Sequence, residues 1–156
     1  MTAARLHPTT TAMTANQPTY TSALQQMKAY RTLRGHVQKV LDVYSLNSSQ
    51  WAILGYLYEH PDGASVNSLA QLLDVKAPLV SVLVAPLLTA LLLATAENSI
   101  DRRAKSLTIT DKGKELVKVV EETLQLRLLT IFSSVSDEDM RSYMDVLQRI
   151  IDYRNP

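Results

Sequence analysis

NSLAQLLDVKAPLVSVLVAPLLTAL, residues 67–91, predicts two helices joined by a tight turn at Asp74-Val75. We expect the first helix over about residues 67–73, and the second from residue 76 or 77 to about residue 91. Pro78 suits the second helix because it would lie in the first turn, where its missing N–H has no helical partner. Two short helices connected in this way are a helix-turn-helix signature.

The same stretch opens a run of twenty uncharged residues, Ala77 to Ala96, which has the length of a membrane span. Pro78 and Pro86 interrupt this run, and hydroxyl side chains add polar breaks. The rest of the chain has the pattern of amphipathic helices, and no continuous apolar stretch of the signal-peptide kind is found near the N-terminus. We therefore expect a cytoplasmic protein that does not associate with membranes.

A β-hairpin is expected directly after the second helix. Leu92–Glu97 and Lys105–Ile109 have the composition and alternation of strands, and Asn98-Ser99 suits a turn between them. Asp101, Arg102 and Arg103 fall in the connecting loop.

Longer amphipathic helices are expected on both sides of this region. Apolar residues recur at intervals of three and four over residues 20–44, and Asn47, Ser48 and Ser49 are good caps for a helix that ends at His60-Pro61. Thr110 is expected to cap a fifth helix, and the segment beginning at Ser136 resembles a capping box that opens a sixth. We expect the sixth helix to bury Met140, Tyr143, Met144, Leu147, Ile150 and Ile151.

Composition excludes several kinds of chemistry. The 156 residues include no cysteine, which removes disulfides, thiolate metal sites and thiol nucleophiles. The histidines His7, His36 and His60 lack metal-ligand spacing, and no Gly-rich phosphate loop or nucleophile elbow occurs. We expect no catalytic residues, no metal and no cofactor, and hence no enzyme. The net charge of +1 means that any affinity for nucleic acid depends on local clusters of Lys and Arg.

Several motifs resemble the MarR family of winged helix-turn-helix transcriptional regulators. Leu46-Asn47-Ser48-Ser49-Gln50-Trp51-Ala52-Ile53-Leu54 is similar to the family's Leu-x-x-x-Gln-Trp-x-x-Leu motif, and Ser68–Leu73 resembles its xLAxxL helix. The most specific match is residues 101–113, which resemble Asp-Arg-Arg-x-x-x-x-x-Leu-Thr-x-x-Gly with Ile109 in place of Leu.

This resemblance implies a mainly α fold with a small β-hairpin wing, formed by a DNA-binding lobe and a helical dimerisation region. It implies a homodimer that binds double-stranded DNA, with repression that a small-molecule effector relieves. The expected divisions are a disordered tail at 1–19, a dimerisation helix at 20–46, the DNA-binding lobe at 47–112 and C-terminal dimerisation helices at 113–156.

The hairpin tip and the start of the second helix hold the candidate DNA contacts. Arg102 and Arg103 could enter a minor groove, where the potential is negative, with Asp101 orienting a guanidinium. The alternative is an exposed ion pair that holds the hairpin. The candidates on both elements are Lys76, Ala77, Pro78, Ser81, Val82, Asp101, Arg102, Arg103 and Lys105.

The second helix differs from its relatives because its outer face is apolar. Val82, Ala85 and Pro86 occupy positions where charged residues are usual, and Lys76 stands where a capping Ser or Thr is common. Ala77 and Val82 could touch thymine methyls, and a phosphate contact would offset the unfavourable Lys76 charge. DNA binding could also rest on the wing and DNA shape, or the face could bind a protein, as in an adaptor or antirepressor that does not read DNA. A third alternative is that the helix has drifted in sequence after the loss of DNA binding.

The resemblance to the family also implies a ligand pocket, which would lie between the dimerisation helices and the DNA-binding lobe. Its candidate residues are Tyr30, Arg34, His36, Trp51 and Tyr58. The alternative is plain packing of an aromatic cluster.

Overall fold

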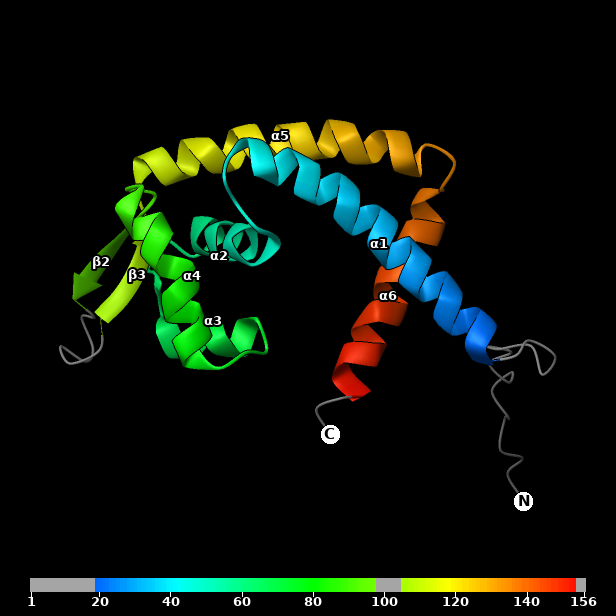
Figure 1. Ribbon diagram of the computed structural model, residues 1–156, viewed down its shortest axis with the longest axis horizontal. Helices are drawn as coiled ribbons and strands as arrows, with labels where there is room; N and C mark the ends of the chain where they lie inside the picture. The colour runs from blue at the N-terminus through cyan, green and yellow to red at the C-terminus, as the bar shows by residue number, and fades with distance from the viewer. Residues whose placement is uncertain (1–18, 98–104, 154–156) are drawn as a thin grey trace, which may run out of the picture. The chain divides into compact units, whose positions relative to one another are not determined.

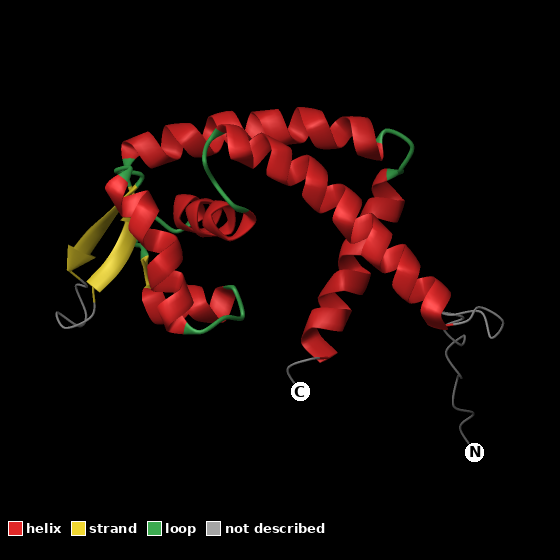
Figure 2. Ribbon diagram, viewed as in Figure 1, coloured by secondary structure: helices red, strands yellow, loops and turns green. Residues whose placement is uncertain are grey.

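A computed structural model describes residues 19–97 and 105–153 of the chain. Helices dominate these residues, and three short strands form one small sheet (Figures 1 and 2). The helices are α1 (Thr19–Val43), α2 (Ser48–Glu59), α3 (Val66–Leu72), α4 (Ala77–Thr89), α5 (Asp111–Phe132) and α6 (Asp137–Tyr153). The strands are β1 (Ala64–Ser65), β2 (Leu93–Glu97) and β3 (Lys105–Ile109). The predicted mainly α fold with a hairpin is confirmed, and the predicted helix ends lie within about two residues of those observed.

The chain forms two compact units, residues 1–35 and 36–156. The division falls inside α1, between Gly35 and His36. The described part of the first unit is the part of α1 from Thr19 to Gly35. The second unit contains the helix-turn-helix, the sheet, α5 and α6.

The sheet has three antiparallel strands in the order β1-β3-β2. β2 and β3 form the predicted hairpin, with Leu93 opposite Ile109 and Thr95 opposite Leu107. The sequence did not reveal β1, which pairs Ala64 with Leu107 on the other edge of β3. β3 is therefore paired along both edges, and β1 ties the start of α3 to the hairpin.

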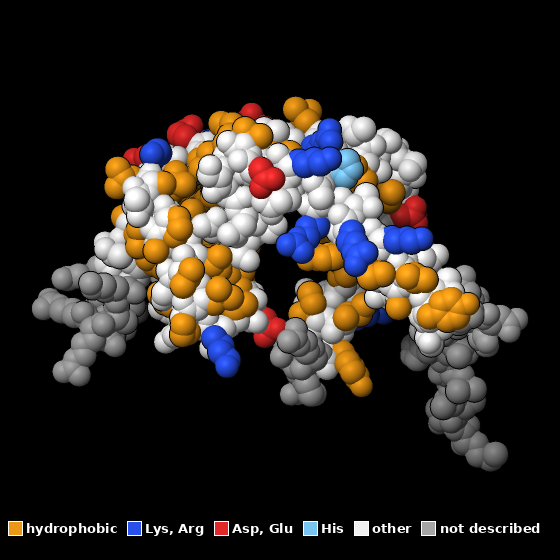
Figure 3. All heavy atoms as spheres, viewed as in Figure 1, with side chains coloured by type: hydrophobic (Ala, Val, Ile, Leu, Met, Phe, Trp, Pro, Cys, Tyr) orange, Lys and Arg blue, Asp and Glu red, His pale blue; other side chains and the backbone are white. Residues whose placement is uncertain are grey.

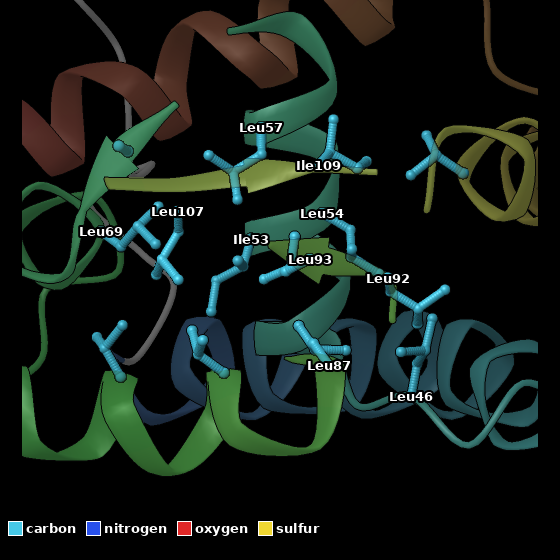
Figure 4. Close-up of a cluster of buried hydrophobic side chains, with 14 of the residues drawn as sticks. Leu46, Ile53, Leu54, Leu57, Leu69, Leu87, Leu92, Leu93, Leu107 and Ile109 are labelled. Carbon is cyan, nitrogen blue, oxygen red and sulfur yellow. The ribbon is translucent and has the colours of Figure 1, made fainter. Parts of the chain in front are cut away.

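A leucine-rich core joins α2, α3, α4 and the sheet, as the close-up in Figure 4 shows. Ile53, Leu54 and Leu57 of α2 are fully buried, and Leu87 of α4 and Leu93 of β2 lie against them. α2 also packs on α5. Each fully buried side chain of this kind contributes about 1.5–3 kcal/mol relative to the exposed state, so this core holds the lobe together.

The predicted helix caps are formed. Asn47 Oδ1 accepts a 2.9 Å hydrogen bond from the Gln50 backbone N–H, and Gln50 Oε1 accepts one of 3.1 Å from the Asn47 N–H. Thr110 Oγ1 accepts from the Gly113 N–H at 3.1 Å, and Ser136 Oγ accepts from the Asp139 N–H at 3.1 Å. These side chains satisfy N–H groups that have no partner within their helices.

Three helices end in the same motif without glycine. Ser45, Asp74 and Leu91 have φ values of 56°, 52° and 58°, and they follow α1, α3 and α4. In each case the next residue donates to a carbonyl five residues back, as in the 2.9 Å bond from Leu92 N to Leu87 O. This is the Schellman arrangement, in which a left-handed residue turns the chain sharply and the following side chain returns to the core.

Leu91 is the costliest of these three residues. A leucine in the left-handed region is disfavoured by roughly 1–2 kcal/mol, because its Cβ approaches the following carbonyl. Its side chain is 67% exposed and contributes little packing in return. The strain is tolerated because Leu87 and Leu92, on either side of the turn, are buried.

We predict that Leu91→Gly raises the free energy of unfolding by about 1 kcal/mol, because glycine adopts a positive φ without the Cβ contact. Urea denaturation would measure this change. Leu91→Ala is the matched control, since it removes the exposed side chain but keeps the Cβ. A glycine variant no more stable than the alanine variant would show that the left-handed backbone at Leu91 is not strained.

The expected burial of α6 is wrong for the single chain. No residue of α6 is buried, and Tyr143, Met144, Ile150 and Ile151 are exposed. On the other long helices, Leu24 and Tyr30 of α1 and Val119 of α5 are also exposed. The spacing located the apolar faces correctly, but periodicity does not reveal what covers a face.

The uncharged run from residue 77 to residue 96 divides into the 13 residues of α4, a turn and β2. No single helix among the described residues has the length and hydropathy of a membrane span. Only α3 and α4 taken together do, and they are bent by 107°.

Candidate nucleic-acid interface

α4 is the second helix of the helix-turn-helix, and its inner face fastens it to the lobe. Val80, Val84 and Leu87 are buried, at spacings of four and three residues. Since these positions share one side of a helix, the opposite side must face outward. The core thereby determines which residues of α4 face solvent.

Gln50 adds a polar link between α2 and α4. Its side chain is 7% exposed, and its Nε2 donates a 3.1 Å hydrogen bond to the Leu83 carbonyl oxygen. The same side chain completes the cap of α2 through its Oε1. Sequence reasoning noted Gln50 only as part of a motif, and the structure supplies its physical role.

We predict that Gln50→Ala lowers the free energy of unfolding by about 1–3 kcal/mol, because it removes two hydrogen bonds at a buried position. Thermal or urea denaturation would measure the loss. Gln71→Ala on α3 is the matched control, since Gln71 is exposed and its variant should differ from the wild type by less than about 0.5 kcal/mol. Equal effects of the two substitutions would contradict this role.

The outward face of α4 is apolar. Pro78, Val82, Ala85 and Thr89 are exposed at spacings of four, three and four residues, so they form one stripe along the helix. Val82 is 68% exposed and lies within the stripe. Figure 3 shows hydrophobic side chains gathered over this region of the surface. α4 carries no charged side chain at all.

The hydroxyl groups of α4 are directed to its own backbone. Thr89 Oγ1 donates to the Ala85 carbonyl oxygen at 3.0 Å, and Ser81 Oγ donates to that of Ala77 at 3.4 Å. A hydroxyl that donates within its helix keeps only acceptor capacity for an outside group. The exposed face of α4 therefore presents methyl and methylene groups and no side-chain donor in these conformations.

Positive charge is placed at the two ends of α4. Lys76 is the N-cap residue, its side chain makes no capping hydrogen bond, and it is exposed. At the other end, Lys112 Nζ donates a 2.8 Å hydrogen bond to the Ala90 carbonyl oxygen. A cation at a helix C-terminus is favourable because it meets the negative end of the helix dipole. Lys112, which sequence reasoning did not single out, therefore fastens α5 to the end of α4.

Thr110 and Gly113 complete the junction between α4, the hairpin and α5. Thr110 Oγ1 donates to the carbonyl oxygens of Leu91 and Leu92, at 2.7 and 3.1 Å. Gly113 lies so close to the Leu92 carbonyl that an added Cβ would overlap it. The Thr-x-x-Gly part of the sequence motif is thus explained as a cap and a close backbone contact.

The remaining candidate contacts belong to the wing. Asp101, Arg102 and Arg103 lie outside the described residues. Lys105 is the first residue of β3 and stands opposite Glu97 of β2 in the register. β2 and β3 are thus the described segments on either side of residues 98–104. On α4, the candidates Ala77 and Ser81 are half-buried and exposed respectively.

The five residues expected to line a ligand pocket have varied surroundings. Tyr30 and Arg34 lie in the first unit, where the guanidinium carbon of Arg34 is 6.0 Å from the centroid of the Tyr30 ring. In the second unit, Trp51 is half-buried, Tyr58 is exposed, and His36 Nδ1 accepts a 3.2 Å hydrogen bond from Arg127 Nε.

Two open cavities of the second unit have none of these five among their lining residues. One of about 1030 Å³ lies beside the α3–α4 turn. One of about 460 Å³ lies between α5 and the C-terminal end of α1, and Lys39, Tyr44 and Arg127 contribute to its wall.

The described residues contain no cluster of three or more His, Asp or Glu side chains that could hold a metal ion. On α5, Glu115 accepts a 2.8 Å hydrogen bond from Lys118 Nζ, and this bond raises the pKa of the Lys118 ammonium. Both side chains are exposed, so the pair has little effect on stability.

Comparison with known proteins supports the interpretation of this lobe. A model of the MarR family matches residues 44–104, from the end of α1 through the hairpin loop. The crystal structure of the Staphylococcus aureus MepR–DNA complex is 25% identical, with a TM-score of 0.70, and the match covers 85% of this chain and 96% of that chain.

The helix-turn-helix lobe, over residues 44–104, is therefore similar to the MarR family. A second structure of MepR, described as a transcription regulator of the Staphylococcus aureus multidrug efflux pump MepA, is 26% identical with a TM-score of 0.64, over 86% of this chain and 98% of that chain. CouR from Rhodococcus jostii RHA1, bound to p-coumaroyl-CoA, shares the fold at 19% identity, with a TM-score of 0.73 over 82% of this chain and 89% of that chain. This chain therefore shares the fold of these transcriptional regulators.

Proposed function

We propose that this chain is a homodimeric transcriptional repressor that reads a pseudo-palindromic operator and is released by a small-molecule effector. The observation that carries this proposal is the helix-turn-helix lobe, in which α4 is fixed by its inner face and left open on its outer face. The MepR–DNA complex, whose fold this chain shares, supports the assignment of DNA as the partner. A two-fold protein matches a two-fold operator, so each lobe would bind one half-site.

The proposed DNA contacts fall into two groups. Lys76, Ala77, Pro78, Ser81 and Val82 would lie in or beside the major groove, because they begin the second helix of a helix-turn-helix. Asp101, Arg102, Arg103 and Lys105 would reach the neighbouring minor groove from the wing. α4 itself has no charged side chain. The electrostatic attraction to phosphates would therefore come from the Lys and Arg side chains among these proposed contacts.

The proposed dimer rests on α6. Its apolar residues share one face, and each of them is exposed or only half-buried in the single chain. A contiguous apolar face of this size on a helix usually marks an interface. A second copy of the chain would cover it and place two lobes at a fixed separation.

We predict that Ile150→Asp weakens dimerisation by at least about 3 kcal/mol, because it would bury a charge without a partner. Ile150 is 60% exposed in the single chain, so the substitution should leave the folded lobe intact. Sedimentation would report the dimer, and circular dichroism the fold. Ser142→Asp, which adds the same charge away from the apolar face, should remain dimeric. A dimeric Ile150→Asp protein would refute this interface.

We predict that Arg103→Ala weakens operator binding by roughly 1–3 kcal/mol and leaves the dimer intact, because the wing would lose a minor-groove cation. Fluorescence anisotropy with an operator selected from a random duplex pool would measure the loss. Arg149→Ala on α6 removes the same charge outside the proposed contacts and should retain wild-type affinity. Unchanged binding by Arg103→Ala would refute the proposed contact between Arg103 and DNA.

A second candidate function is favoured by the apolar face of α4: an adaptor or antirepressor that binds a protein and does not read DNA. The two functions respond differently to salt. Binding to DNA should weaken steeply as salt rises, because each neutralised phosphate releases counterions, whereas an apolar protein interface should respond little. Failure to bind any duplex at low ionic strength would favour the adaptor.

The proposed effector site draws on residues named from the sequence. In the second unit, His36 Nδ1 accepts a hydrogen bond from Arg127 Nε, and Arg127 lines the 460 Å³ cavity. Lys39 and Arg127 make an anionic ligand the best electrostatic match. Such a ligand would act by changing the spacing of the two lobes, so that both no longer fit one operator.

A further inference from the structure

We infer that α4 recognises its half-site through the C5-methyl groups of thymines in the major groove, with Val82 as the principal contact. This inference rests on the proposed function and specifies its chemistry. It assigns sequence preference to the apolar stripe of Pro78, Val82, Ala85 and Thr89 rather than to hydrogen-bonding side chains.

The first argument is the chemistry of the exposed face. In the major groove, guanine, adenine and cytosine are distinguished by hydrogen-bond donors and acceptors, whereas thymine also presents a methyl group. The stripe on α4 has no charged or amide side chain, and the Ser81 and Thr89 hydroxyls donate to the backbone of α4 itself. Among these features of base edges, the thymine methyl is therefore the best match to the stripe.

The second argument is the size of the side chains. Those of the stripe are short, and none is aromatic or arginine, the types that dominate protein–protein hot spots. Short side chains instead allow the helix backbone to approach the floor of the groove. Val82 is the largest aliphatic side chain of the stripe and is 68% exposed, so its two methyl groups can reach furthest.

The third argument is charge. Neither α3 nor α4 carries an acidic side chain, so these two helices do not repel a phosphate backbone. Lys76, at the start of α4, is exposed and has the sign that suits a phosphate beside the groove. A face that is apolar at its centre and cationic at its N-terminal end is complementary to a groove with methyl groups at its floor and phosphates at its rim.

Uracil tests this inference directly, because it differs from thymine only by the missing methyl group. In an operator selected by the full-length protein, each thymine would be replaced by deoxyuridine, one position at a time and symmetrically in both half-sites. We expect at least one position at which affinity falls about 15-fold, or about fourfold for each methyl that the dimer loses. If no position weakens binding by more than about twofold while the operator is still bound, the inference is overturned and the proposed function stands.

Val82→Ala identifies the contact. At the sensitive position, this variant should bind the thymine and uracil operators with nearly equal affinity, because the aliphatic group that meets the methyl is absent. Val119→Ala, which shortens an exposed valine of α5, should retain the wild-type ratio of the two affinities whatever its absolute affinity. A full thymine preference in Val82→Ala would overturn the assignment. Absence of binding to any duplex would instead refute the proposed function itself.

Discussion

The apolar contact between the inner face of α4 and the leucine core is the interaction on which this structure depends. Val80, Val84 and Leu87 fill the space above α2 and the sheet, and Gln50 fixes the helix by a hydrogen bond to its backbone. A close-packed core tolerates few alternative arrangements. The rotation of α4, and hence the set of residues it offers to a partner, follows from this contact.

The junction at the end of α4 fixes the start of the hairpin and of α5 relative to α4. Leu91 turns the chain at a strained left-handed position. Thr110 donates to the carbonyl oxygens of Leu91 and Leu92, and Lys112 donates to that of Ala90, the C-cap residue of α4. The hairpin and the long α5 helix therefore start from one rigid point. In the proposed dimer, such rigidity would determine the directions of the hairpin and of α4 relative to one DNA site.

The apolar surfaces of the molecule differ in character. The face of α6 contains large side chains such as Met144 and Ile151, which suit a stable interface with another copy of the chain. The stripe on α4 contains short side chains, which suit the close approach of a helix to a groove. The same hydropathy therefore supports two different proposals, because side-chain size decides which kind of surface can fit against it.

Local chemistry in the sequence determined the helices and the hairpin, and it pointed to the resemblance of the lobe to the MarR family. Asn47, Thr110 and Ser136 cap helices because their side chains accept backbone N–H groups, and periodicity marked the apolar faces. Only the tertiary structure decided what covers each face, because burial depends on segments distant in the sequence. It showed α6 uncovered, paired β1 with β3, gave Gln50 and Lys112 their partners, and set the apolar stripe of α4 toward solvent.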